Sequence, residues 1–567
     1  MANGFGSLYV GSSGLQSAQN ALNATANNLA NVDTKGYVRQ QVRFADKNYS
    51  NLKLATPKTA MQQSGLGVSI GDVVHARDIF LDKAFRTETG RYGFYSTMYE
   101  NVSNVEDMFQ ELHGEEFKES IDDLWSAFQE LAKDSMNSTN QNLVVQKSEL
   151  FISRCNSLYS DLKSYQNNLN DQIYDDIQTV NDIGKQIYQL NNDIIKVESG
   201  GQETAMTLRD QRDALLDQLA GYGNVTASED QFGAVTVTFE NIDFVDDNRC
   251  YEIQMKADKT TGFYTPYWGQ LSDVDSGEYV PVFRMDRDIS SEFNTDVGKI
   301  KALMVSRGTT YGKYSDLDDE TSYKTIENNT VMEAQAQIDK LFHSIATGVN
   351  DILCPNTELQ TAITTTDGQT YAVGTRILDV DNCTLGEDKQ LPPQELFSRI
   401  GCDRYTTVTG TDGKTYYIYN EEYMSDTSKQ YMIGSTKINP EIQAQITKLP
   451  VYTQNGAVDY ELGKKLTALW EAKDMTINPY DNTPCTFQNY YNKVVDMLGN
   501  AGNVYSSATD TLSNTVESVD NQRSQVTGVA SDEELTHMVK FQSAYNAASR
   551  FITVISEMTE LIVTGLI

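Results

Sequence analysis

The strongest constraint on this chain is a heptad pattern at its two ends. No proline occurs from 532 to 567, and apolar residues recur there at alternating steps of three and four. Such a stripe is typical of a helix that packs on a helical partner. Leucines also stand seven residues apart near the start of the chain. We expect an assembly interface formed by Leu8, Leu15, Leu22 and Leu29 in a first helix and Met538, Phe541, Tyr545, Ala548, Ile552, Ile555, Ile562 and Leu566 in a last helix.

Each of these two seams is weak when taken alone. Gly11 and Gly14 lie in the first helix, and Thr559 interrupts the stripe of the last. Burying four leucines contributes about 1.5–3 kcal/mol each, whereas fixing the backbone of roughly 25 residues costs about 1–2 kcal/mol per residue. Helical hydrogen bonds offset only part of that cost. We therefore expect both ends to be loosely ordered in a free monomer and helical when packed on each other and on neighbouring copies.

Size and charge restrict the class of protein. At 567 residues the chain is too long for one core, so three or more units are expected. The 79 acidic and 45 basic side chains give a net charge of −34, which argues against nucleic acid or an anionic membrane as a partner. No apolar run is long enough to span a bilayer. The first residues lack the basic and apolar segments of a cleavable signal peptide.

The segment NNLANVDTKGY, residues 27–37, follows the first helical pattern. Asn31, Asp33 and Gly36 favour turns, because short polar side chains bond to nearby backbone and glycine accepts a positive φ. The sequence therefore predicts that the helix ends here and the chain turns.

The segment 27–37 resembles the N-terminal motif of the bacterial flagellar axial proteins, a family of rod, hook and hook-associated proteins. FQSAYNAASR at 541–550 and EMTELI at 557–562 resemble the closing helix of that family. The segments at 67–88, 208–220 and 522–534 are similar to those of the hook–filament junction branch, the hook-associated protein 1 family. The residues of this sequence that carry the N-terminal motif are Asn27, Asn28, Leu29, Asn31, Gly36 and Tyr37.

The resemblance implies a structural component of the flagellum. Family members form a short helical ring that joins hook to filament, with paired terminal helices inside and middle domains outside. It also implies four partners: further copies of the chain, the hook protein, a second hook-associated junction protein, and an export chaperone on the C-terminal helix. The implied location is extracellular, at the hook–filament junction, reached by the flagellar type III export apparatus.

Periodicity divides the chain into helical and β-rich segments and predicts a multidomain α+β fold. The terminal helices would pair as a coiled-coil core, beside a helical bundle domain and β-rich outer inserts. A long helix should end near Gly200, and Asp-Gly turns at 367–368 and 412–413 predict hairpins. Alternating apolar and polar residues at 235–240, 251–256 and 279–284 predict strands. The expected segments are a helical arm and turn (1–60), a mainly helical bundle (61–221), a β-rich segment (222–330), a returning helix (331–362), a β-rich outer insert (363–435), a return segment (436–484) and C-terminal coiled-coil helices (485–567).

Catalytic and metal-binding patterns are not found in the sequence. The histidines, residues 75, 113, 343 and 537, are far apart and lack metal-ligand spacing. The six cysteines are scattered singly, so reduced thiols are expected, with Cys383 and Cys402 as the candidate pair. We therefore expect no cofactor, no metal and no enzymatic activity.

Three alternatives remain open at this stage. The nearest is another axial component such as the hook protein, which shares the end motifs. A second is an enzymatic insert, a peptidase or glycan hydrolase, within 222–440. A third is a coiled-coil adhesin, whose terminal helices would stay folded in isolation.

The expected disorder of the ends is open to a direct test. We predict that backbone amides of residues 4–30 and 531–564 exchange hydrogen rapidly in a dilute monomer and slowly in an assembled sample, because helical pairing protects them only when both partners are held together. Amide hydrogen exchange followed by mass spectrometry measures both states. Strong protection in the dilute monomer would contradict the prediction.

Overall fold

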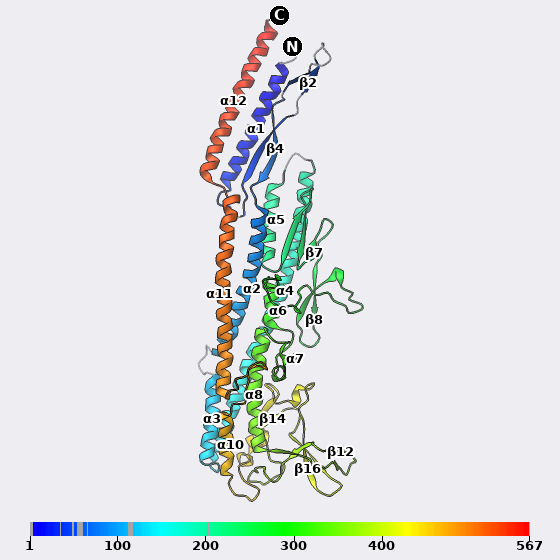
Figure 1. Ribbon diagram of the computed structural model, residues 1–567, viewed down its shortest axis with the longest axis vertical. Helices are drawn as coiled ribbons and strands as arrows, with labels where there is room; N and C mark the ends of the chain where they lie inside the picture. Colours follow the sequence, from blue (N-terminus) through cyan, green and yellow to red (C-terminus); the bar gives the residue numbers. More distant parts are fainter. Residues whose placement is uncertain are drawn as a thin grey trace.

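The computed structural model describes residues 4–34, 36–47, 50–53, 61–64, 66–110, 117–200 and 204–565. The molecule is elongated, with the first and last helices side by side at one end and small sheets along one flank (Figure 1). The predicted fold class, multidomain α+β with paired terminal helices, is confirmed. No helix among the described residues is long and apolar enough to cross a membrane.

The end of the molecule that holds both termini consists of two helices and two antiparallel pairs of strands. Helix α1 packs along α12, and both β1 and β4 contact α1. β1 pairs antiparallel with β4, and β2 with β3. The predicted helical arm was therefore incomplete, because residues 40–75 contain strands. The bounds are α1 Gly4–Ala30, β1 Gln40–Asp46, β2 Ser50–Lys53, β3 Met61–Ser64, β4 Val68–His75 and α12 Ser531–Thr564.

The body is built on long helices. α2 packs along α11, and α4 packs against α3, α5, α6 and α8. The long helix expected to end near Gly200 is α4, which spans 61 residues and ends at Glu198. At 1.5 Å per residue it reaches roughly 90 Å along the body. The bounds are α2 Ile79–Gln110, α3 Phe117–Lys133, α4 Ser138–Glu198, α5 Met206–Ala220, α6 Lys299–Arg307, α7 Glu320–Tyr323, α8 Thr330–Leu353, α9 Pro440–Ala444, α10 Tyr460–Glu471 and α11 Phe487–Thr527.

The segment 222–330 is β-rich only in its first half. β6 alternates buried and half-buried residues as its sequence predicts. The strand expected at 279–284 is reduced to one bridge between Tyr267 and Pro281, because proline has no N–H to donate to a ladder. Beyond it the chain is irregular until α6. The bounds are β5 Val225–Glu229, β6 Val235–Phe239, β7 Ile242–Val245, β8 Ile253–Ala257 and β9 Tyr264–Trp268.

The outer insert contains short strands and both predicted hairpins. Gly368 and Gly413 have φ of +89° and +77°, which the Asp-Gly turns require. A four-stranded sheet has the order β10, β13, β16, β15. The bounds are β10 Asn356–Glu358, β11 Ile363–Thr364, β12 Thr370–Tyr371, β13 Arg376–Leu378, β14 Phe397–Arg399, β15 Tyr405–Thr409, β16 Thr415–Tyr419 and β17 Thr436–Ile438.

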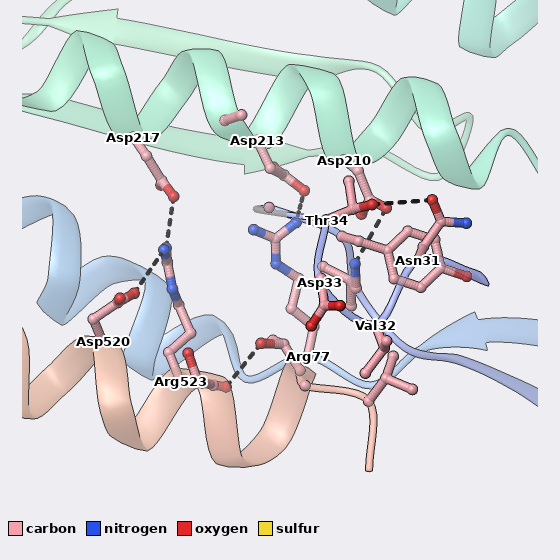
Figure 2. Close-up of a pocket in the computed structure, with 18 of the residues that line it drawn as sticks. Asn31, Val32, Asp33, Thr34, Arg77, Asp210, Asp213, Asp217, Asp520 and Arg523 are labelled. Atoms are coloured by element: carbon pink, nitrogen blue, oxygen red, sulfur yellow. Dashed lines mark hydrogen bonds and ion pairs between the residues drawn. The ribbon is translucent and has the colours of Figure 1, made fainter. Parts of the chain in front are cut away.

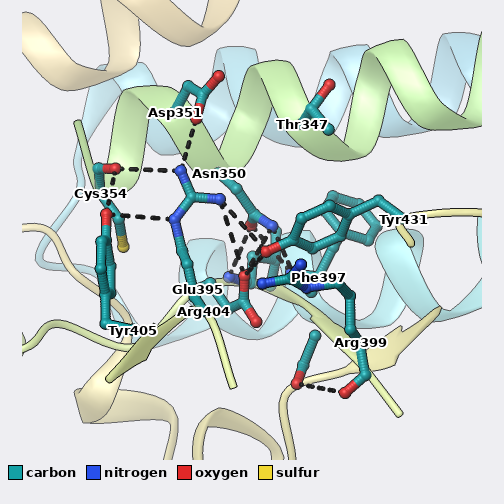
Figure 3. A network of polar contacts seen from close by, with 12 residues as sticks. Thr347, Asn350, Asp351, Cys354, Glu395, Phe397, Arg399, Arg404, Tyr405 and Tyr431 are labelled. Atoms are coloured by element: carbon teal, nitrogen blue, oxygen red, sulfur yellow. Dashed lines mark hydrogen bonds and ion pairs between the residues drawn. The ribbon is translucent and has the colours of Figure 1, made fainter. Parts of the chain in front are cut away.

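A buried polar network attaches this insert to α8 (Figure 3). Arg404, 3% exposed, bonds to Asp351 and to the carbonyl of Cys354 on α8 and its C-cap. Glu395 accepts from Tyr431 Oη and, at 3.1 Å, from Asn350 Nδ2. Since buried charges are tolerated only when they are paired and hydrogen-bonded, the network serves to hold the insert in place.

Asparagines on helices bind strand backbones throughout the body. Asn181 on α4 donates to the carbonyl of Ile253 (2.9 Å) and accepts from its N–H (2.8 Å). Asn191 likewise donates to the carbonyl of Val235 (2.8 Å) and accepts from its N–H (3.2 Å). On α8, Asn350 donates to Phe397 O at 2.7 Å and accepts from its N–H at 3.1 Å. A side-chain amide thus replaces a neighbouring strand as the partner of these backbone groups.

Most of the buried apolar side chains of the body form one contiguous cluster, which runs from Val105 to Leu498, and smaller clusters lie beside it. It includes residues of the helices and of both β-rich segments. The cause is that α4 and α8 run along both β-rich parts, so the inserts share a core with the helices. Among the described residues, none from α1 or α12 belongs to this cluster, so the terminal pair packs separately from the body.

We predict that Gly11→Leu weakens the α1–α12 contact by about 1–3 kcal/mol through overpacking. A Cβ atom added at Gly11 would lie 2.8 Å from Ile552 Cγ1. Gly6→Leu is the matched control, because a Cβ there meets nothing within 4 Å. Hydrogen exchange of the amides around residue 552 in an assembled sample should quicken in the first variant only. Equal exchange in both variants would contradict the close packing.

Candidate assembly interface

The predicted stripe of α12 faces α1. Its members from Met538 to Ile555 are half-buried, which fits helices that lie in contact along one side. Ile562 is 54% exposed, so it does not pack on α1 within one chain, and its place in an interface between copies stays a prediction. Leu566 lies outside the described residues. The half-buried members are Met538, Phe541, Tyr545, Ala548, Ile552 and Ile555.

The leucines of α1 are not its most buried residues. Leu15, Leu22 and Leu29 are half-buried, and Leu8 is 39% exposed. The buried face consists of small or polar side chains instead, because α1 is enclosed between α12 and the β1–β4 pair and the backbones approach closely. Gly11, expected to weaken the seam, permits this approach, because a Cβ atom there would lie 2.8 Å from Ile552 Cγ1. The buried residues are Gly11, Ser13, Ser17, Ala18, Ala21, Thr25 and Asn28.

Helix α12 carries a second apolar row that the sequence analysis missed. Its side chains are between 43% and 75% exposed. In the last half of the helix they follow steps of three and four, each one position before a member of the predicted stripe, and this spacing was visible in the sequence. We call this set the outer row of α12: Leu535, Val539, Phe551, Val554, Met558 and Leu561.

Asn28 of the N-terminal motif joins three chain segments. Its side chain is 1% exposed. Nδ2 donates to Gln40 O at 3.0 Å and to Glu534 Oε2 at 3.1 Å. Oδ1 accepts from Gln40 N at 3.0 Å and from Tyr37 Oη at 2.9 Å. Glu534, 2% exposed, also accepts from Arg39 Nε at 2.8 Å. We call this arrangement the Asn28 clasp; it ties α1 and the start of β1 to the first turn of α12.

The other motif residues shape the turn beside the clasp. Asn31 Nδ2 donates to the carbonyl of Asn27 at 2.9 Å, and the predicted helix end lies at Ala30. Gly36 has φ of +84°, a conformation that glycine accepts readily. Burial, and secondarily the carboxylates of Asp210 and Glu534, raise the pKa of Tyr37 to about 12, so its hydroxyl keeps its proton and remains a donor.

One face of α5 carries an acidic ladder that meets arginines from three other segments (Figure 2). Asp213 pairs with Arg77. Asp217 accepts from Arg86 Nε at 2.8 Å and from Arg523 on α11 at 2.6 Å. The members of the ladder are Asp210, Asp213 and Asp217, which recur at steps of three and four on one helix face. The ladder connects α5 to α2 and to the last turn of α11.

Asp210 closes the ladder at the terminal end. It accepts from Val38 N at 3.3 Å and lies 3.5 Å from His75 Nε2. Burial raises the pKa of Asp210 to about 7, against the opposing effects of the Val38 N–H and Arg77. Burial, followed by Arg77 and Arg209, lowers the pKa of His75 to about 4. The two groups therefore meet as a neutral imidazole and a carboxyl that loses its proton only near pH 7.

A cavity of about 710 Å³ lies between the ladder, the turn at 31–37 and the end of α11. Its walls combine the acidic groups of Asp33, Asp213 and Asp520 with the bases Arg77 and Arg523. Asp213 is already paired with Arg77, and Asp520 with Arg523. The cavity lies at the joint between the terminal pair and the body.

The remaining histidines and the cysteines lie at several different places in the fold. His343 stacks on Tyr314 with ring centroids 3.8 Å apart, and His537 lies near Phe541. His113 lies outside the described residues. The six cysteines are free thiols, Cys383 and Cys402 included. In the described part of the chain, no three His, Cys, Asp or Glu side chains gather as a metal site.

Comparison with known proteins points to one family. Residues 102–364 match the flagellar hook-associated protein FlgK helical domain, and residues 8–37 match the flagella basal body rod protein. Flagellar hook-associated protein 1 of Bacillus subtilis is 24% identical over 97% of this chain and 96% of its own. The chain is therefore similar over nearly its whole length to flagellar hook-associated protein 1.

Two further proteins extend the comparison. Flagellar hook-associated protein 1 of Salmonella typhimurium is 22% identical over 95% of this chain and 96% of its own. The structure of the flagellar hook junction protein FlgK from Burkholderia pseudomallei matches with a TM-score of 0.50 and 13% identity, over 78% of this chain and 99% of that one. The hook-associated protein 1 fold therefore extends over most of this chain.

We predict that Asn28→Ala destabilises the terminal pair. The substitution leaves the backbone N–H and C=O of Gln40 without their partner, at a cost of ~1–3 kcal/mol for each buried group left unpaired. Asn20→Ala on the exposed face of α1 is the control. Trypsin cleavage at Arg39 should accelerate in assembled Asn28→Ala and stay unchanged in Asn20→Ala. Unaltered cleavage of both would show that the clasp does not hold β1.

Proposed function

We propose that this chain is the structural subunit of the hook–filament junction of a bacterial flagellum, where a short helical ring of copies adapts hook to filament and permits filament assembly. The observation that carries the proposal is the similarity over nearly the whole chain to proteins named flagellar hook-associated protein 1. The hook protein is the less favoured alternative, because the matched helical domain at 102–364 is that of a hook-associated protein.

The terminal pair supports assembly by copies of the same chain. The outer row of α12 leaves large apolar side chains in solvent, where Leu561 is 75% exposed. Burying each would contribute about 1.5–3 kcal/mol. Its surface differs from the surface that α1 presents, so contact between copies is head-to-tail and propagates a helix instead of closing a dimer. In our proposal the interface comprises the predicted stripes together with this row.

The remaining partners follow from the same role. The ring contacts the hook protein on one side and a second hook-associated junction protein on the other. Before export, a chaperone covers α12, because two apolar rows on one helix would aggregate in a free chain. Loosely ordered ends suit passage through the flagellar type III export channel. The relatives carry the names of structural flagellar proteins, and the role needs no enzymatic activity, cofactor, nucleic acid or membrane insertion.

The first experiment is deletion of the gene, with electron microscopy of the cells and an assay of filament protein in the medium. Bare hooks and shed, unpolymerised filament protein are the expected result. Absent hooks would instead make the chain a hook or rod component, and intact filaments would contradict the junction role.

Complementation of the deletion strain then tests the interface. Val554→Asp in the outer row should fail to restore filaments, because a charge is placed where apolar contact is expected, whereas Val554→Leu should restore them. Ile552→Asp and Ile555→Asp should fail as well. Far-UV circular dichroism of the purified variants should show a folded body, since α12 lies outside the body's core. Filaments restored by Val554→Asp would contradict a role for this row.

A further inference from the structure

A pocket of about 200 Å³ lies beside the first two turns of α8, away from the terminal pair and its joint. Helices α2 and α11 form two of its walls, and the turn before α8 forms a third. The side chains of Glu327, Glu333 and Gln337 line it together with apolar ones. We call it the Glu333 pocket. Its apolar members are Val102, Ala334, Met497, Leu498 and Ala501.

One oxygen atom of this pocket is buried without a hydrogen-bond donor. Gln337 is 0% exposed, and no group in the described part of the chain donates to its Oε1. Its Nε2 donates to Glu333 Oε1 at 3.4 Å and lies 3.9 Å from Met497 Sδ, which leaves Oε1 as the free end of the amide. Because buried polar atoms are costly when they are unpaired, this oxygen indicates a ligand that brings a donor.

The pocket has negative charge and lacks a positive one. Glu333 is half-buried, and Glu327 lines the same space. The described lining residues include no Lys, Arg or His. Burial raises the pKa of Glu333 to about 7, opposed by the hydrogen bond from Tyr323 and assisted by the charge of Glu327. A cation in the pocket would favour the ionised form of Glu333 and would be bound more tightly by it.

Only tyrosines face Glu333 from the neighbouring helices. Tyr323 at the end of α7 donates its hydroxyl to Glu333 Oε1 at 2.8 Å. On α11, burial and to a smaller extent the charge of Glu333 raise the pKa values of Tyr490 and Tyr505. All three phenols therefore stay protonated near neutral pH, so Glu333 is the buried group of this pocket that changes its charge there.

A primary alkylammonium group fits these walls. Its nitrogen carries three N–H donors for the three acceptor side chains, and its alkyl chain can lie on the apolar members, as the stem of a lysine does when its charged head reaches polar groups. A guanidinium favours a planar, two-point acceptor instead. Calcium takes about six to eight oxygen ligands and gains nothing from apolar walls. The net charge of −34 also attracts cations to this chain.

We propose that the Glu333 pocket binds a primary alkylammonium group, whose nitrogen donates to the carboxylates of Glu333 and Glu327 and to Gln337 Oε1. This chemistry is shared by the lysine side chain of a neighbouring protein and by a free alkylamine. The inference goes beyond the proposed function, because the pocket lies on the body and takes no part in the pairing of the terminal helices.

Saturation-transfer NMR of n-pentylammonium with the purified full-length chain tests the site. The Kd should be about tenfold lower at pH 8 than at pH 6, because a carboxyl with a pKa of about 7 is roughly nine-tenths ionised at pH 8 and one-tenth at pH 6. The ligand keeps its charge at both values, since alkylamines titrate near pH 10. n-Pentanol, which has the same chain without the charge, should show no saturable binding.

Matched variants locate the binding. Glu333→Gln keeps the shape and an acceptor for Tyr323 but removes the charge, so it should raise the Kd at least tenfold at pH 8 and remove the pH dependence. Glu471→Gln, at the exposed end of α10, is the control and should bind as the unaltered chain does. Thermal unfolding checks that both variants are folded. No saturable binding by the unaltered chain, or equal affinity in Glu333→Gln, would overturn the proposal.

Carbodiimide crosslinking of isolated flagella distinguishes the two sources of the ligand, and this arm alone depends on the proposed function. The reagent joins a carboxylate to a lysine amine that it contacts. A peptide with Glu333 or Glu327 linked to a lysine of another protein or another copy would support a protein-borne ligand. Amine binding by the purified chain without such a link would support a free alkylamine.

Discussion

A buried asparagine that bonds both the N–H and the C=O of a strand residue is the contact on which this structure depends most. Asn181, Asn191 and Asn350 fasten short strands to α4 and α8. The sheets are too small to be stable alone. They persist because a long helix supplies hydrogen bonds to their backbones and apolar surface to their side chains. Asn28 applies the same interaction to β1 at the terminal end.

The joint between the terminal pair and the body depends on charge instead of apolar area. The acidic ladder of α5 meets arginines of α2 and α11, and its end reaches Val38 and His75. At this joint, ion pairs and a cavity of about 710 Å³ take the place of a packed apolar core. The two parts are therefore connected by specific polar contacts while their apolar packing stays separate, which suits a subunit whose terminal helices find further partners in an assembly.

Much of the fold could be predicted from the sequence because its signals are local. The heptad stripe of α12, the end of α4, the turn at 31–37 and the two Asp-Gly hairpins each follow from the spacing or type of neighbouring residues. The strand expected at 279–284 failed because a local alternation was outweighed by Pro281. The strands at 40–75 were not predicted, because the fold of the first domain was inferred only from the helical pattern at its start.

The candidate interface could likewise be predicted from the sequence only in part. The sequence by itself determined the helical ends, the apolar stripe of α12 and the family motif, since helical periodicity and turn chemistry depend on residues close along the chain. Only the tertiary structure decided that α1 buries Gly11, Ala18 and Asn28 in preference to its leucines, that Glu534 meets Asn28 and Arg39, and that Ile79 and Phe80 remain in solvent. The physical reason is that burial and pairing depend on which surfaces meet in space. Here Asn28 and Glu534, whose side chains meet, are 506 residues apart in sequence.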